Sequence, residues 1–144
     1  MVPAIIETLM RVQRGRVHRD PSEQPTVRRR LEELSIETST QLGQFFMTFS
    51  LGGVLSVRDI ELLDLCSPSA QIRDATKFGR EIYGVENQFI CLTSGEDEGF
   101  VLYSISDESV YDVGVNDLKR LPDGIVTPRW KSFNDLIIWY LQPN

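Results

Sequence analysis

Apolar side chains recur at the three- and four-residue spacing of an amphipathic helix in five parts of the chain. We expect helices over residues 4–12, 26–34, 39–49, 69–83 and 133–141. The clearest apolar stripe lies in 39–49 and consists of Leu42, Phe45, Phe46 and Phe49. Such a stripe is typical of a helix that packs against a sheet or against other helices.

Capping residues and glycines mark where two of these helices begin and end. Thr38 or Ser39 can cap the start of the 39–49 helix, because a hydroxyl oxygen accepts bonds from free backbone N–H groups. Gly52-Gly53 is expected to end it, since glycine readily adopts the left-handed conformation that closes helices. Ser132 is expected to cap the last helix.

Short apolar runs bounded by polar turns predict β-strands. They cover residues 60–66, 89–92, 100–105 and 109–113. In the first run, Glu61 and Asp64 are expected to point outward. Two short loops join the last three runs, which implies antiparallel pairing.

The order of these elements predicts an α+β fold with a mainly antiparallel sheet flanked by helices. A chain of 144 residues fits a single domain. A domain of this size buries about two-thirds of its unfolded surface and needs neither disulfides nor metal to fold. We divide the chain into an N-terminal helix with a basic linker, residues 1–25, and an α+β domain, residues 26–144.

Charge is distributed unevenly along the chain, whose formal net charge is −6. Residues 1–30 carry seven arginines against three acidic residues, whereas residues 31–144 carry eight basic and eighteen acidic residues. A body this negative repels nucleic acid and anionic membranes and attracts basic partners. We interpret Arg11, Arg14, Arg16 and Arg19 as a solvated linker and not as a nucleic-acid contact, because no aromatic residues lie among them to stack on bases.

The most informative feature is an acidic stretch that coincides with the three predicted antiparallel strands. No basic residue lies between Arg80 and Lys119. The same interval holds nine acidic ones: Glu81, Glu86, Glu96, Asp97, Glu98, Asp107, Glu108, Asp112 and Asp117. Charges fixed on strands and tight turns suggest a protein that binds another protein.

Six of these carboxylates lie on the predicted turns and the last strand, and we take them as candidate partner-binding residues. They are Glu96, Asp97, Glu98, Asp107, Glu108 and Asp112. The first three and the next two lie at opposite ends of the middle strand, so we expect no single compact pocket.

The residue types needed for most enzyme and metal chemistry are scarce. His18 is the only histidine and lies in the predicted linker, and the two cysteines are far apart. The acidic turn lacks the ligand spacing of a calcium loop, and the chain has no glycine-rich phosphate loop. We therefore expect no cofactor, no metal and no enzymatic activity. A small hydrolase with paired carboxylates remains the enzymatic alternative, and it requires a pocket that shifts their pKa values.

Cys66 and Cys91 lie in apolar runs and are expected to be buried thiols, with a disulfide or a reactive thiol left open as alternatives. The N-terminal residues lack the charged region and long apolar run of a secretory signal. No stretch approaches the roughly 20 apolar residues of a membrane helix. These features predict a cytoplasmic protein.

The last predicted helix is apolar on nearly all of its faces. Ile138, Trp139 and Leu141 lie outside its main apolar stripe. Such a helix is either buried widely or offers Trp139 to a partner, including a second copy of the chain.

The order of motifs resembles the SUKH superfamily over about residues 26–141. The resemblance lies in the helix that holds Gln41-Leu42-Gly43-Gln44-Phe45-Phe46, Gly52-Gly53 after it, Ser94-Gly95 opening an acidic turn, Gly99-Phe100-Val101-Leu102-Tyr103, and Ser132-Phe133 before the last helix. The chain departs from the family where Glu37-Thr38 stands in place of a frequent Leu-Pro, and at Leu51 and Val54 beside the glycines.

The resemblance implies a non-catalytic α+β protein that acts by binding. Bacterial members of the superfamily are toxin-immunity proteins that neutralise a cognate toxin, often a nuclease or deaminase, in the cytoplasm. Fungal members are regulators of cell-wall assembly and glucan synthesis. The leading hypothesis is therefore an immunity protein with a basic toxin domain as partner, and the alternative is a regulatory scaffold in cell-wall or glucan synthesis.

Overall fold

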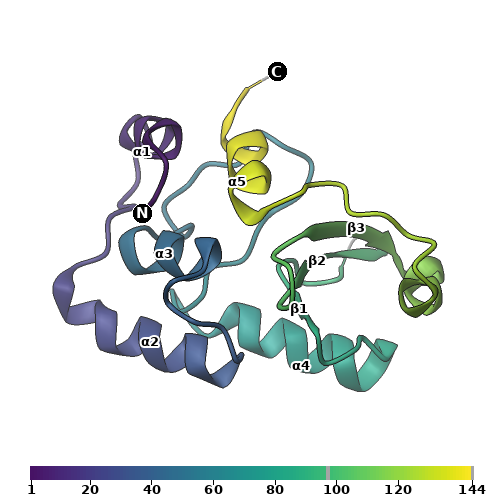
Figure 1. Cartoon of the computed structure of the whole chain (residues 1–144). Helices are drawn as coiled ribbons and strands as arrows, with labels where there is room; N and C mark the ends of the chain where they lie inside the picture. Colours follow the sequence, from purple (N-terminus) through teal and green to yellow (C-terminus); the bar gives the residue numbers. More distant parts are fainter. Residues whose placement is uncertain (97, 144) are drawn as a thin grey trace.

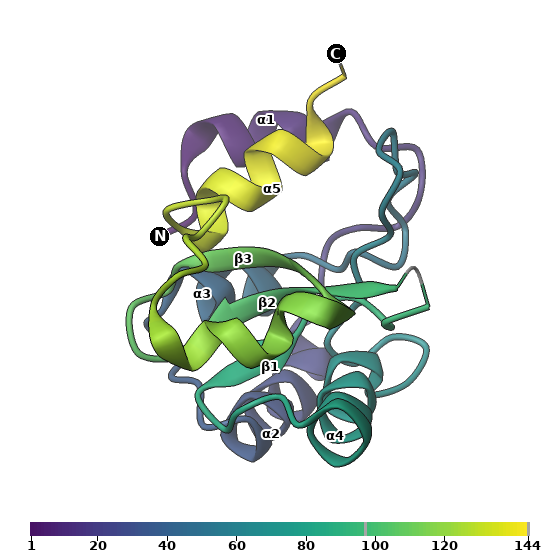
Figure 2. The same ribbon diagram turned by 90° about the vertical axis from the view of Figure 1, so that its right-hand side faces the viewer.

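The computed structural model describes residues 1–96 and 98–143, and Figures 1 and 2 show it from two directions. Its α-helices are α1 (Ala4–Arg11), α2 (Gln24–Glu33), α3 (Gln41–Thr48), α4 (Gln71–Tyr83) and α5 (Phe133–Leu141). Its strands are β1 (Phe89–Cys91), β2 (Gly99–Ser104) and β3 (Val110–Gly114), and two 3₁₀ helices are η1 (Pro21–Glu23) and η2 (Val115–Asp123). The predicted α+β class and the five predicted helices are confirmed.

The sheet is the predicted antiparallel meander, with strand order β1-β2-β3. Ile90 of β1 lies opposite Tyr103 of β2, and Val101 of β2 lies opposite Asp112 of β3. Both pairs of neighbouring strands are joined by turns, as the short polar loops in the sequence predicted.

Both faces of the sheet are buried. Side chains alternate between the two faces of a strand, and here each set enters a different part of the core. Ile90, Val101 and Tyr103 pack in the larger cluster with apolar side chains of α1, α2, α3 and α5. Phe100 and Leu102 pack in the smaller cluster with residues of α4 and η2. Figure 1 shows α5 on one side of the sheet and α4 on the other, so only the turns and edges of the sheet reach solvent.

The helix caps follow hydroxyl chemistry but not always at the predicted residue. Ser132 caps α5 as predicted, because its Oγ accepts a bond from the N–H of Asp135 at 3.2 Å. Helix α3 is capped by Thr40 and not by Thr38 or Ser39. The Thr40 N–H and hydroxyl both donate to the Glu37 carbonyl, at 3.2 and 2.7 Å, and this turn delays the start of the helix.

The prediction that Gly52-Gly53 ends α3 is wrong. The helix ends at Thr48, and Phe49 is already extended, with φ −127° and ψ 157°. A Cβ on Gly53 would lie 2.3 Å from the carbonyl oxygen of Arg16. Gly53 is therefore required for the close passage of the N-terminal segment across this turn, and not for helix termination.

The strand predicted over 60–66 does not form. Leu63 donates its N–H to the Leu92 carbonyl at 2.9 Å, so the segment lies beside the end of β1 without joining the sheet. The carboxylate of Asp64 accepts the N–H groups of Leu51, Cys66 and Ser67 at 2.8, 3.2 and 2.9 Å. These bonds fold the segment into a bend. Because the N–H groups of Cys66 and Ser67 already donate to Asp64, they cannot form hydrogen bonds to a neighbouring strand.

Arg19 and Asp64 form a buried ion pair, which contradicts two expectations. Their side chains are 0% and 1% exposed, and Arg19 Nη2 lies 3.0 Å from Asp64 Oδ2. Arg19 also donates to the Phe46 carbonyl at 3.0 Å and to the Ser67 hydroxyl at 3.3 Å. Arg19 is therefore not part of a solvated linker, and Asp64 does not point outward. The pair fastens the N-terminal segment to the core.

The last helix is buried widely, as the first of the two interpretations of its apolar surface expected. Phe133, Leu136 and Ile137 are buried. Trp139 is half-buried, with the ring of Trp130 at 5.1 Å and the guanidinium groups of Arg58 and Arg129 at 4.4 and 4.7 Å from its ring centroid. No helix in the described part of the chain is long and apolar enough to cross a membrane.

Candidate functional site

Four of the carboxylates predicted to bind a partner lie in two groups at opposite ends of β2, and a fifth, Asp112, lies on β3 opposite Val101. Glu96 and Glu98 belong to the turn between β1 and β2, whereas Asp107 and Glu108 belong to the turn between β2 and β3. Asp97 lies outside the described residues. The separation matches the expectation that these side chains do not share one pocket, and the two groups differ in what surrounds them.

Glu108 is bonded to the N-terminus of α3. Its Oε1 accepts the N–H of Gln41 at 2.8 Å and the hydroxyl of Tyr103 at 3.1 Å. A carboxylate at a helix N-terminus also interacts favourably with the helix dipole. Burial raises the pKa of Tyr103, and the nearby Glu108 raises it further, so the phenol stays protonated and donates. Glu108 thus joins the β2–β3 turn to α3.

Asp107 stabilises the same turn from within. Its Oδ1 accepts the hydroxyl of Ser109 at 2.6 Å and the N–H of Ser109 at 3.0 Å. These bonds to Ser109 lower the pKa of Asp107, because they favour the charged carboxylate. Both carboxylates at this end of β2 therefore accept hydrogen bonds from groups of the protein itself.

Asp112 is exposed but already paired. Its Oδ2 lies 2.6 Å from Nη1 of Arg129. The Arg129 guanidinium also stacks over Trp130, 4.5 Å from the ring centroid. A partner that uses Asp112 has to compete with Arg129 for the carboxylate.

Glu96 and Glu98 differ from the other candidates because both are exposed and, among the described residues, neither carboxylate accepts a hydrogen bond as those of Asp107 and Glu108 do. Among the described residues, no cation lies within ion-pair distance of either carboxylate. Gly95 has φ +82° and packs against the ring of Phe100, where a Cβ would lie 2.6 Å from ring carbons. Glu96 and Glu98 both expose their charges to solvent.

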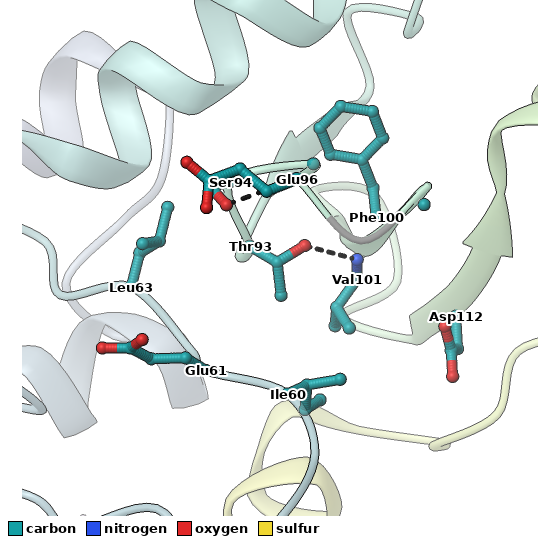
Figure 3. A pocket seen from close by; sticks show the side chains of 11 residues that line it. Ile60, Glu61, Leu63, Thr93, Ser94, Glu96, Phe100, Val101 and Asp112 are labelled. Carbon is teal, nitrogen blue, oxygen red and sulfur yellow. Dashed lines mark hydrogen bonds between the residues drawn. The ribbon is translucent and has the colours of Figure 1, made fainter.

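A pocket of about 150 Å³ lies beside this turn (Figure 3). Its lining includes Glu61 from the 60–66 segment, Glu96 from the turn and Asp112 from β3. In Figure 3 the carboxylates of Glu61 and Asp112 lie at opposite sides, with Ile60 and Val101 between them. The sequence did not predict the contribution of Glu61, because nothing local indicates that the 60–66 segment meets the β1–β2 turn.

The pocket offers negative charge without an acid–base or metal constellation. Its carboxylates do not converge on one point in Figure 3. Within residues 1–96 and 98–143, no group of three or more His, Cys, Asp or Glu side chains could hold a metal ion. His18 lies in the N-terminal segment against Phe49, with 5.2 Å between ring centroids. The arrangement is suited to attracting a cation on a partner.

The two cysteines are free thiols, so the disulfide alternative is wrong. Burial raises the pKa of Cys91 to about 12, and burial also raises the pKa of Cys66. Both thiols are therefore protonated at neutral pH, which makes them poor nucleophiles because the thiolate is the reactive form.

No protein-family model matches the chain, and no curated protein matches it either.

Proposed function

We propose that this protein is a non-catalytic protein-binding module, of the immunity type, that neutralises a basic toxin domain in the cytoplasm. The observation that carries the proposal is the pair of exposed carboxylates, Glu96 and Glu98, at one end of the sheet, neither of which has an ion-pair partner in the described part of the chain. Glu61 extends the negative surface around the adjoining pocket, which Asp112, paired with Arg129, also lines.

Such a surface favours a partner with a positive cleft. Nucleases and deaminases that act on nucleic acids hold an anionic substrate, and a fixed negative surface complements the cationic groups that they use for it. Electrostatic attraction of this kind raises association rates by about ten- to a thousandfold at low salt. A typical stable interface covers about 800 Å² on each partner, so the acidic turn would form only part of the contact.

The resemblance to the SUKH superfamily supports the immunity function over other kinds of binding. The turn opened by Ser94-Gly95 is the acidic turn of the candidate surface, and Ser132-Phe133 begins α5, so two of the motifs behind the resemblance coincide with structural features. The alternative within the same superfamily is a regulatory scaffold in cell-wall or glucan synthesis, and the identity of the partner distinguishes the two.

The test is affinity capture with a matched control. The wild-type protein, the variant Glu96→Lys/Glu98→Lys and the control Glu32→Lys/Glu37→Lys serve as baits, and captured proteins are identified by mass spectrometry. Glu32 lies on α2 and Glu37 in the turn between α2 and α3, and both are exposed. Each variant replaces two glutamates by lysines, so both have the same net charge. We expect a basic partner to be captured by the wild type and the control and to be lost with the Glu96/Glu98 variant. A folded wild type that captures no partner contradicts the proposal.

A further inference from the structure

The outer surface of α4 carries apolar side chains that the protein's own core does not cover. Phe78, Ile82 and Tyr83 are 43, 63 and 37% exposed. They come from the last six residues of one helix, whose other side is buried through Ile72 and Ala75. Contiguous exposed apolar groups on a folded domain are characteristic of interaction surfaces.

These side chains form a single ordered ridge. Phe78 and Ile82 are four residues apart and so lie on the same side of the helix. The ring of Tyr83 packs edge-on against Phe78, with centroids 5.7 Å apart, and against Phe100 of β2, at 5.6 Å. Phe100 is fully buried, so the ridge is anchored to the sheet. We call Phe78, Ile82 and Tyr83 the α4 ridge.

The helix that carries the ridge is fixed on the edge of the sheet. The hydroxyl of Thr76 accepts the N–H of Cys91 at 2.9 Å. Arg80 donates to the carbonyls of Asn87 and Phe89, both at 3.0 Å. These bonds satisfy groups on the outer edge of β1, and they bring the ridge to the protein surface in one conformation. A partner that binds it does not have to order the helix first, which reduces the entropy cost of binding.

The charges around the ridge are negative. Glu81 is exposed and lies three residues from Phe78, next to it on the helix surface. Glu86 is exposed two residues after Gly84, which ends the helix. Arg80 does not offset them fully, since its guanidinium faces the carbonyls at the edge of β1. Lys77 lies about 100° around the helix from Phe78, because each residue of an α-helix is rotated by about 100° from the one before it. Its charge therefore lies to the side of the ridge.

We propose that the α4 ridge is the apolar centre of the docking face, and that its occupant is a protein surface with apolar side chains bordered by Lys or Arg. The inference rests on the proposed function, because it names where on this chain the basic partner docks. Aromatic and large aliphatic side chains contribute most of the energy at protein interfaces, and surrounding charges contribute mainly orientation and rate. The α4 ridge supplies the apolar contact, and the carboxylates of Glu81 and Glu86 supply the surrounding charge.

A second exposed apolar segment provides the natural comparison. Leu55 and Val57 are more exposed than Phe78 and lie in a segment without regular secondary structure. They are also followed by carboxylates, at Asp59 and Glu61. Leu55 makes a matched control because it tests whether any exposed apolar side chain near acidic groups behaves like the ridge.

The experiment uses a defined probe, a synthetic 18-residue amphipathic helix of leucine and lysine. Its binding to the isotope-labelled full chain is followed by amide chemical shifts. We expect saturable shifts concentrated in residues 74–86, and an approximately tenfold weaker affinity for Ile82→Ser. Leu55→Ser should change the affinity by less than twofold. A peptide of equal charge with serine in place of leucine should cause no saturable shifts. The amide spectra of the Ile82→Ser and Leu55→Ser variants show whether these variants remain folded.

Three outcomes overturn the inference. Shifts concentrated at residues 55–61 or 93–96, with Ile82→Ser binding as the wild type does, place the docking face elsewhere. An absence of saturable binding removes the evidence for an apolar centre. A dimer of the chain, detected by sedimentation and abolished by Ile82→Ser, means that a second copy covers the ridge. None of these results decides whether a basic partner is captured through Glu96 and Glu98, so failure of the ridge is distinguishable from failure of the proposed function.

Discussion

Glu98 and Glu108 occupy equivalent turns at the two ends of β2, and both have φ 63°. Glu108 compensates for this unfavourable backbone conformation by bonding to Gln41 and Tyr103. Glu98 is exposed and has no ion-pair partner among the described residues. Two similar acidic turns therefore have different roles: the β2–β3 turn connects the sheet to α3, and the β1–β2 turn presents charge to solvent. A carboxylate that contributes little to the fold is the better candidate for binding.

The largest effect is expected at Asp64, which is more buried and accepts more hydrogen bonds than either Glu98 or Glu108. Asp64→Ala leaves Arg19 charged, buried and without its main partner, and it frees three backbone N–H groups. We expect the free energy of unfolding to fall by about 3–5 kcal/mol, measured by urea denaturation. Glu61→Ala, an exposed carboxylate in the same segment, is the control and should change it by less than about 0.5 kcal/mol. A loss below about 1 kcal/mol for Asp64→Ala would show that the pair does not fasten the N-terminal segment.

The next effect separates the two turns directly. Glu108→Ala removes the acceptor for the Gln41 N–H and the Tyr103 hydroxyl, so we expect a loss of about 1–3 kcal/mol in the free energy of unfolding. Glu98→Ala keeps the same backbone strain and removes no such bond. Its effect should stay within about 0.5 kcal/mol. Equal losses for the two variants in urea denaturation would remove the distinction between the turns.

A smaller, pH-dependent effect is expected at Asp107. Its bonds to Ser109 lower the pKa of Asp107, so its contribution is fully present above the unfolded-state pKa of about 3.9 and is lost as the pH falls through the lower folded-state value. Asp107→Asn should reduce the free energy of unfolding by about 1 kcal/mol at pH 7. The difference from wild type should shrink below about pH 4 in denaturation measured across pH. A difference that grows on acidification would contradict the assignment.

The smallest effect is expected at Glu98, with the opposite sign. Glu98→Gly places glycine in a left-handed conformation that it adopts without strain. We therefore expect the free energy of unfolding to rise by at most about 1 kcal/mol. Glu108→Gly relieves the same strain but also loses two hydrogen bonds, and it should be a net loss. Thermal unfolding of the two variants side by side measures this contrast. A loss for both would indicate that Glu98 has a structural partner.

The sequence was sufficient wherever the determining interactions are local. The i, i+3, i+4 spacing around Phe45 and Phe46 predicts α3, and the Ser132 hydroxyl predicts the start of α5, because helical contacts lie within one turn. The three strands of the meander follow from apolar runs joined by short turns. The carboxylates were predicted as one surface feature, but which of them are hydrogen-bonded within the protein depends on partners such as Gln41, 67 residues away from Glu108.

The errors at Asp64 and Gly53 have one physical cause, since both involve groups that are distant in the sequence, whereas the misplaced cap of α3 comes from the local turn between Glu37 and Thr40. Asp64 lies in an apolar run and looks like one outward residue of a strand, yet its partner Arg19 is 45 residues away. Gly53 is positioned by the close approach of Arg16, and not by the helix before it. The only local hint was the charge of Asp64 inside the run Leu62-Leu63-Asp64-Leu65, which is unfavourable to bury unless it is paired.

The most direct test of the central claim is the rate at which the captured partner associates with the wild type and with Glu96→Lys/Glu98→Lys, measured by stopped flow over a range of salt concentrations. If the β1–β2 turn is the binding surface, the variant should associate with the partner about tenfold more slowly than the wild type at low salt. The difference in rate should narrow as salt screens the charges. The control Glu32→Lys/Glu37→Lys should remain within about threefold of the wild type. Equal association rates for the Glu96/Glu98 variant and the wild type at every salt concentration would contradict the claim.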